Sequence, residues 1–189
     1  MSPPAKTLSN GGPKGNETMT SYRIVPMNEN HIGGFHAAID VISREKKYFD
    51  ILMAPPLENI RRNVLANIEL GHPQFVALNA ETVVGWCSIL PFSNPSMSHR
   101  GGLWIGILPE HRGKGLGSEL LKRTIDAAAT FGMTRVELTV REGNAKAITL
   151  YKKHGFEIEG FHRNSLRLDG TYYNVWSMAR LLSSANDPP

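Results

Sequence analysis

The segment PEHRGKGLGSELL, Pro109 to Leu121, sets three glycines at alternate positions directly ahead of a run that favours a helix. These glycines and the two basic residues set among them are Gly113, Gly115, Gly117, Arg112 and Lys114. Glycine tolerates positive φ and lets the backbone approach another group closely. Successive amides ahead of a helix can converge on an anion, and the helix adds unpaired N–H groups and the positive end of its dipole. The segment therefore predicts a phosphate-binding loop.

The spacing of the glycines distinguishes between kinds of phosphate site. A nucleotide P-loop requires GxxxxGK[ST], whereas the lysine here stands between glycines. The dinucleotide fingerprint requires GxGxxG, whereas this chain has GxGxG. A third pattern, [RQ]xxGx[GA], is matched by Arg112, Gly115 and Gly117. The match follows an expected strand and opens an expected helix, which is the context that this pattern requires.

Strands and helices are expected on both sides of the loop, from the spacing of apolar residues and from turn signals. The expected strands are 22–27, 74–78, 82–90, 103–108, 135–140, 156–161 and 172–181. The expected helices are 31–49, 57–70, one that runs from the loop to about residue 131, and 144–154. Because strands and helices are mixed along the chain, the fold class is α/β or α+β, in a single domain at 21–183.

The composition, with 41% hydrophobic and 20% charged residues, is that of a soluble globular protein. Residues 1–20 are rich in Pro, Gly, Ser, Thr and Asn and predict a disordered tail, and 184–189 a second short tail. The N-terminus lacks the apolar stretch of a secretory signal, and no run is long enough for a membrane helix. The single cysteine, Cys87, excludes an internal disulfide and favours a reducing compartment, so a cytoplasmic location is expected.

Two segments in the right order resemble the GCN5-related N-acetyltransferase (GNAT) superfamily. RGKGLG resembles its diphosphate-binding loop, and the preceding LWIGILPEH resembles its fourth strand. NAKAITLYKKHGFEIEG resembles its second signature, a helix with an Asn near the start and a Tyr near the end. The C-terminal third further resembles the bacterial subgroup that acetylates amino acids and phosphinothricin-like compounds. The resemblance implies a mixed sheet of about six to seven strands, about four helices, and fourth and fifth strands that splay apart.

The resemblance also implies the acetyl donor, acetyl-CoA, and the residues that bind it. A bulge in the fourth strand is expected to free backbone groups for the pantetheine arm at Ile105, Gly106 and Ile107. The loop is expected to hold the diphosphate through the backbone amides of Arg112, Gly113, Lys114, Gly115, Leu116, Gly117 and Ser118. Asn144 is expected to contact CoA, although an N-cap role alone would account for it.

Tyr151 is the predicted general acid of the reaction. It lies seven residues after Asn144, which is two helical turns, so both side chains share one face of the helix. When an amine attacks a thioester, the sulfur leaves as a thiolate that needs a proton. A phenol with a pKa of about 10 can supply it to a group whose reference pKa is about 8.5. The alternative for Tyr151 is a core aromatic beside Ile148.

The general base is left open by the sequence. Some relatives carry a Glu in the fifth strand, where this chain has Thr139. Glu137 lies on the same strand face, and His99 in the loop before the fourth strand has a pKa suited to the task. The alternatives are a solvated loop histidine at 99 and loss of the proton through ordered water or to bulk solvent.

The acceptor pocket is expected to involve the first two helices and the last hairpin, with Tyr48, Phe49, Tyr172 and Tyr173 as candidates or as packing residues. No histidine spacing indicates a metal site. The basic residues are scattered, and no membrane or nucleic-acid partner is expected. Relatives often dimerise, so a homodimer is left open.

The sequence thus predicts an acyltransferase that moves an acetyl group from acetyl-CoA to a small-molecule amine by direct attack in a ternary complex. The alternatives are a protein N-terminal or lysine acetyltransferase and a non-catalytic CoA-binding module.

Overall fold

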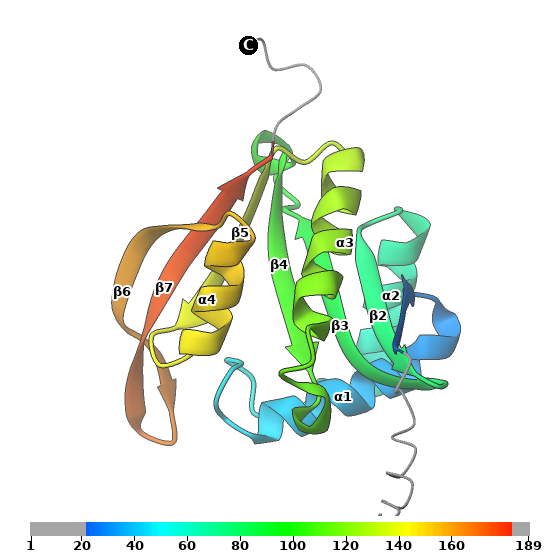
Figure 1. Cartoon of the computed structure of the whole chain (residues 1–189), viewed down its shortest axis with the longest axis horizontal. Helices are drawn as coiled ribbons and strands as arrows, with labels where there is room; N and C mark the ends of the chain where they lie inside the picture. The colour runs from blue at the N-terminus through cyan, green and yellow to red at the C-terminus, as the bar shows by residue number, and fades with distance from the viewer. Residues whose placement is uncertain (1–21, 183–189) are drawn as a thin grey trace, which may run out of the picture.

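The computed structural model describes residues 22–182, so the tails predicted at 1–20 and 184–189 lie outside the described residues. Seven strands form one sheet in the order β1-β2-β3-β4-β5-β7-β6 (Figure 1). The strands are β1 (Tyr22–Pro26), β2 (Gln74–Asn79), β3 (Thr82–Pro91), β4 (Arg100–Ile107), β5 (Arg135–Arg141), β6 (Glu157–Leu168) and β7 (Thr171–Leu181). The α-helices are α1 (Ile32–Arg44), α2 (Leu57–Glu69), α3 (Leu116–Thr130) and α4 (Ala145–Lys153).

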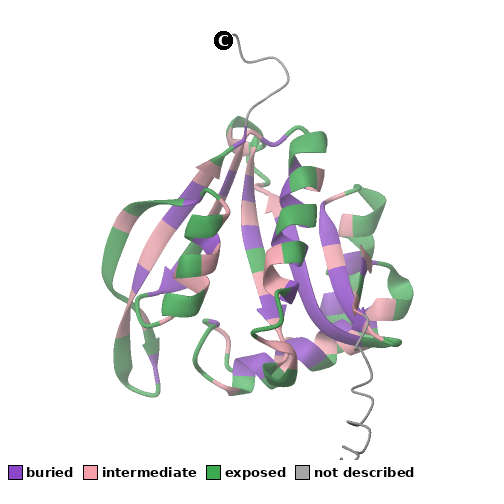
Figure 2. Cartoon of the chain, viewed as in Figure 1, coloured by how far each residue is buried: buried purple, intermediate pink, exposed green. Residues whose placement is uncertain are grey.

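Each face of the sheet has its own hydrophobic core. Leu120, Leu121 and Ile125 of α3 pack with Tyr151 of α4 in one cluster, and α1 and α2 supply the helical residues of the other. Neighbouring residues of β3 serve opposite clusters, because successive side chains of a strand point to opposite faces. Figure 2 shows buried residues along β3 and on the inward sides of the helices. The helices predicted from apolar spacing are therefore those that cover the sheet.

The splay between β4 and β5 is confirmed. The two strands run parallel and pair at three positions, Arg100↔Arg135, Gly101↔Val136 and Gly102↔Glu137. Beyond Gly102 they diverge, and the rest of β4 has no partner strand on that side (Figure 1). A wedge between two strands exposes main-chain hydrogen-bonding groups that a ligand can use.

The predicted bulge in the fourth strand is wrong. β4 pairs with β3 in unbroken register from Gly85↔Ile107 to Pro91↔Gly101. The opening arises because β5 turns away, and β4 itself stays regular. β4 also begins at Arg100, three residues earlier than predicted, because residues 100–102 pair with β3 and β5 on both sides.

Gly106 is a glycine because of Trp86. A Cβ at position 106 would overlap the six-membered ring of the buried Trp86 indole on the neighbouring strand. The bonds from Leu108 N to Val84 O (2.9 Å) and from Phe92 N to Arg100 O (3.2 Å) fix which main-chain groups of β4 face β3. By the alternation of an antiparallel ladder, the N–H and C=O of Gly106 pair with Trp86. Packing therefore accounts for this glycine.

Candidate active site

The glycine-rich loop presents a run of unused backbone donors. The N–H groups of residues 113–117 donate to no acceptor within residues 22–182. The next two amides, of Ser118 and Glu119, bond to the carbonyl of Gly115 at 3.0 and 3.3 Å and begin α3. Gly113 and Gly115 have φ values of +74° and +79°, and a Cβ on either would meet nothing within 4 Å. Five free donors at a helix N-terminus with open space before them fit a diphosphate.

Arg112 holds the loop in place, and its charge is paired within the chain. Its guanidinium donates to both carboxylate oxygens of Glu45, at 2.9 Å for the Nη1 contact. Its Nε donates to the Ile107 carbonyl at 2.8 Å, and its Cζ lies 4.8 Å from the centre of the Tyr48 ring. Its backbone N–H is also engaged, by the Pro109 carbonyl. Lys114, by contrast, is exposed and forms no ion pair in the described part of the chain.

A groove of about 370 Å³ runs from this loop along the open side of β4. Along β4, every second residue directs its main-chain N–H and C=O towards β3, and Gly106 is one of these. The N–H and C=O of Leu103 and Ile105, and the N–H of Ile107, therefore face the gap between β4 and β5. Ile105 and Ile107 thus present main-chain groups here as expected, whereas Gly106 does not. Asn144 caps α4 by accepting from the Ala147 N–H at 3.3 Å, and it lines the same groove.

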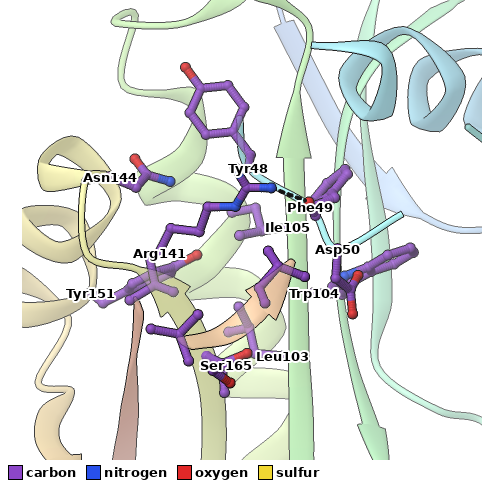
Figure 3. A pocket seen from close by; sticks show the side chains of 14 residues that line it. Tyr48, Phe49, Asp50, Leu103, Trp104, Ile105, Arg141, Asn144, Tyr151 and Ser165 are labelled. Atoms are coloured by element: carbon purple, nitrogen blue, oxygen red, sulfur yellow. Dashed lines mark hydrogen bonds between the residues drawn. The ribbon is translucent and has the colours of Figure 1, made fainter. Parts of the chain in front are cut away.

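A second pocket of about 240 Å³ lies against the far end of this groove (Figure 3). Its walls come from the segment after α1, from β4 and β5, and from β6 and β7. Five residues line both the groove and the pocket, namely Tyr48, Phe49, Ile105, Asn144 and Tyr151. The two spaces therefore meet at a shared wall, where a donor in one could reach an acceptor in the other.

Tyr151 stands at this shared wall. It is 7% exposed, and its ring packs on Phe156 with the centroids 5.8 Å apart. Figure 3 shows its hydroxyl pointing into the pocket, and this hydroxyl has no hydrogen-bond partner among the described residues. Burial raises the pKa of the phenol, and nearby Cys87 raises it further. Tyr151 therefore stays protonated across the whole neutral range and has a proton to donate.

Cys87 is a core residue, as the sequence predicted. It is fully buried, and burial raises the pKa of its thiol to about 12 against a weaker opposing hydrogen bond with Thr124. A thiol with so high a pKa has almost no thiolate at neutral pH and is a poor nucleophile.

His99 is not brought to the site. It is exposed just before β4, at the opposite end of that strand from the glycine loop, and it lines neither the groove nor the pocket. Its carbonyl accepts from the N–H groups of Thr134 and Arg135 at 2.9 and 3.3 Å, so the residue has a structural role in the turn. His99 therefore lies away from the wall at which a base for the acceptor amine would act.

Glu137 is held by arginines and is unsuited to act as a base. Arg100 donates to it at 2.7 Å and Arg135 at 2.9 Å, and Arg135 also pairs with Glu159. Burial raises the pKa of the Glu137 carboxyl, but the hydrogen bonds from the two arginines outweigh it and hold the pKa below the ordinary value. This network joins β4, β5 and β6 at the point where β4 and β5 begin to separate.

Replacing Glu137 by Gln should lower the free energy of unfolding by about 1–2 kcal/mol at neutral pH, because two arginines lose a charged partner. The lowered pKa stabilises the fold above the unfolded-state pKa, and this contribution is lost as the pH falls through the folded-state value. Urea unfolding at pH 7 and near pH 4 should show the difference shrinking. A variant that keeps its stability but loses turnover would restore Glu137 as a catalytic candidate.

The acceptor side of the site contains residues that the sequence did not single out. Tyr48 and Phe49 line the pocket as predicted, whereas Tyr172 and Tyr173 line a neighbouring depression beside Lys46 and Lys47. The charged side chains that line the pocket within residues 22–182 are Asp50 and Arg141. Asp50 directly follows the Tyr-Phe pair, but nothing in its spacing marks it.

In the part of the chain that the structure describes, no group of three or more His, Cys, Asp or Glu residues is placed to hold a metal ion. Within the same residues, no helix has the length and apolar character needed to cross a membrane.

Comparison with known proteins decides the family. Residues 41–156 match the family model described as the Acetyltransferase (GNAT) family. The chain belongs to the GNAT family. A GNAT relative, an L-amino acid N-acetyltransferase of Escherichia coli (strain K12), is 31% identical over 149 residues, which cover 78% of this chain and 91% of that protein. The predicted enzyme class is therefore confirmed: the protein is an acetyl-CoA-dependent N-acetyltransferase.

Two solved acetyltransferase structures share the fold. A phosphinothricin acetyltransferase from Sinorhizobium meliloti, in complex with acetyl-CoA, superposes with a TM-score of 0.81 at 20% identity, over 90% of this chain and 94% of that one. A ribosomal-protein-alanine N-acetyltransferase from Brucella melitensis superposes with a TM-score of 0.80 at 24% identity, over 85% and 99%. The seven strands and four α-helices of this chain are thus those of the GNAT fold.

Proposed function

We propose that this enzyme transfers the acetyl group of acetyl-CoA to the primary amine of an amino acid or a similar small molecule, by direct attack in a ternary complex. The observation that carries the proposal is the shared wall at Tyr151, where the groove from the glycine loop meets the second pocket. Holding two reactants in adjoining spaces makes the reaction effectively unimolecular. No acetylated enzyme is needed, because the one cysteine is buried in the core.

The donor side is assigned from its free main-chain groups. The amides of residues 113–117 hold the diphosphate, with Ser118 at the edge of the same groove. The open edge of β4 at Ile105 and Ile107 binds the pantetheine arm, and Asn144 lies across from it. Bound acetyl-CoA supplies an activated acyl group as a thioester. A main-chain N–H on the open edge of β4 is the donor that polarises the acyl carbonyl.

Tyr151 supplies the proton that the leaving sulfur requires. In water a phenol is a weaker acid than a thiol, by about 1.5 pKa units, so proton transfer would be uphill. The interior around Tyr151 raises the proton affinity of both groups, since burial raises the pKa of Tyr151 and raises that of the nearby Cys87 thiol to about 12. A thiolate released into the same buried wall is disfavoured as a charge, and the Tyr151 hydroxyl is placed there to protonate it.

The amine side is assigned to Asp50. With His99 remote and Glu137 paired, Asp50 is the carboxylate that lines the acceptor pocket in the described chain. Its negative charge attracts an ammonium group to the pocket. The amine then loses its proton to Asp50 or to solvent before it attacks, because an ammonium nitrogen has no free electron pair.

The test is a screen of amines with acetyl-CoA, which follows release of the free thiol and the mass of the product. We expect turnover with amino acids or their analogues. Turnover confined to a protein N-terminus or a lysine peptide would favour the protein-modifying alternative. Acetyl-CoA binding without turnover of any amine would identify a non-catalytic module.

We propose one acetyltransferase domain at 21–183, a cytoplasmic location in keeping with the free Cys87, and no nucleic-acid or membrane partner. Gel filtration would decide between a monomer and a homodimer, and binding assays with DNA and vesicles should give no affinity.

A further inference from the structure

Arg141 lies at the end of β5 with its guanidinium inside the acceptor pocket. It is 7% exposed, and Figure 3 shows it reaching up from the strand towards Tyr48 and Phe49. Nη1 donates to the Lys46 carbonyl at 2.8 Å and Nη2 to the Phe49 carbonyl at 3.0 Å. Its Cζ lies 4.6 Å from the centre of the Tyr173 ring. These contacts fix the fork in one position.

The charge of Arg141 has no carboxylate bound to it. It forms no ion pair with any residue in the range 22–182, and its buried Nε has no hydrogen-bond partner there. Burial lowers the pKa of the guanidinium, with Tyr173 and Asp50 acting more weakly in the opposite direction, and arginine remains charged at any pH at which the protein works. A buried charge to which no carboxylate is bound is costly, and a buried Nε without a hydrogen-bond partner needs an explanation.

Arg112 provides a comparison within the same chain. Both arginines hold the segment after α1, Arg112 through Glu45 and Arg141 through two carbonyls, and both stack on a tyrosine. Arg112 carries its own carboxylate partner in Glu45, whereas Arg141, which lines the acceptor pocket, does not. An arginine can therefore hold this segment while a carboxylate of the chain binds its charge. Holding the segment does not explain why Arg141 lacks such a carboxylate.

We infer that Arg141 binds a carboxylate of the acceptor and makes the enzyme selective for amines that carry one. This inference rests on the proposed function, because it assigns the acceptor to the pocket beside Tyr151. A guanidinium suits the task, since its planar fork matches a carboxylate. The pocket also carries the opposite charge in the exposed Asp50. One cation and one anion among the lining residues complement an amino acid in its zwitterionic form.

The test compares acids with their amides on the wild type and on Arg141→Gln. L-Leucine, L-methionine and L-phenylalanine are each assayed beside the corresponding carboxamide, which keeps the side chain and the α-amine. We expect the ratio of kcat/KM for acid over amide to fall by about 10- to 100-fold in the variant, as expected when a charge-assisted hydrogen bond is lost. Comparing the variant with the wild type cancels the different pKa values of the two amines.

Two further variants separate recognition from folding. Arg141→Lys keeps the charge and should retain part of the preference for acids. Arg167→Gln removes another arginine that stacks on a tyrosine, at 5.3 Å from Tyr172, but it lines neither the groove nor the pocket, so the ratio should not change. Acetyl-CoA affinity and thermal unfolding show whether each variant is folded.

The outcomes are distinguishable. Equal losses for acids and amides in Arg141→Gln would make Arg141 a structural clamp and overturn the inference. A wild-type enzyme with no preference for acids would also overturn it, while turnover itself would leave the proposed function standing. Failure to acetylate any amine would instead remove the proposed function.

Discussion

Replacing Tyr151 by Phe should lower kcat by about 100-fold while the affinity for acetyl-CoA changes by less than about twofold. The substitution removes one oxygen and keeps the ring, so the packing on Phe156 is preserved. What is lost is a protonated hydroxyl at the wall between the two spaces. Without it, the sulfur must leave as a buried anion, and burial disfavours charged groups strongly.

The comparison is made by single-turnover measurements of thiol release and by titration with acetyl-CoA. Tyr172→Phe is the matched control, because it also removes one phenolic oxygen but lines neither the groove nor the pocket. Its turnover should equal that of the wild type. If Tyr151→Phe also turned over at the wild-type rate, the proton would come from elsewhere and Tyr151 would be only a packing residue.

The local features of the site, namely the glycine loop and the helix after it, could be predicted from the sequence because they depend on short-range patterns. Alternate glycines before a helix indicate positive φ and free amides, and Gly113 and Gly115 have both. Seven-residue spacing on a helix placed Asn144 and Tyr151 on one groove. The splay of β4 and β5 came from the family resemblance, because nothing in the composition of two strands reveals where they separate.

The partners of charged side chains could not be predicted, because they depend on segments distant in sequence. Glu45 and Arg112 are 67 residues apart, and Glu137 and Arg100 are 37 apart. From the sequence alone, Arg112 is interpreted as a phosphate ligand and Glu137 as an unpaired carboxylate that could act as a base. His99 precedes β4 and the glycine loop follows it, so the whole length of the strand separates the two. Arg141 and Asp50 can be recognised as candidate binding residues only once the fold places both in the lining of the acceptor pocket.

The segment after α1 gives the two halves of the site a common wall. Arg112, next to the diphosphate loop, binds Glu45 and stacks on Tyr48, while Arg141 binds the carbonyls of Lys46 and Phe49. Tyr48 and Phe49 in turn line both the groove and the pocket. Donor and acceptor are thus positioned by one short segment that is fixed at both ends by arginines.

Replacing Gly115 by Val should weaken acetyl-CoA binding by about 100-fold or more. The residue has φ of +79°, where a β-branched side chain is strained, and the new side chain would occupy the open space in front of the free amides. Two charge-assisted hydrogen bonds lost from the diphosphate account for an effect of this size. Isothermal titration with acetyl-CoA measures it directly.

A control variant must separate the effect of backbone strain on stability from the effect of a blocked loop on acetyl-CoA binding. Gly71 at the end of α2 has φ of +68°, and a Cβ added to it would likewise meet no atom within 4 Å, but it is remote from the groove. Gly71→Val should therefore lose a similar amount of stability, about 1–3 kcal/mol, and keep its affinity for acetyl-CoA. If Gly115→Val folded and bound acetyl-CoA as tightly as the wild type, the diphosphate would lie elsewhere. The role of Tyr151 depends on that placement, because a diphosphate held at this loop directs the rest of the donor along the groove towards Tyr151.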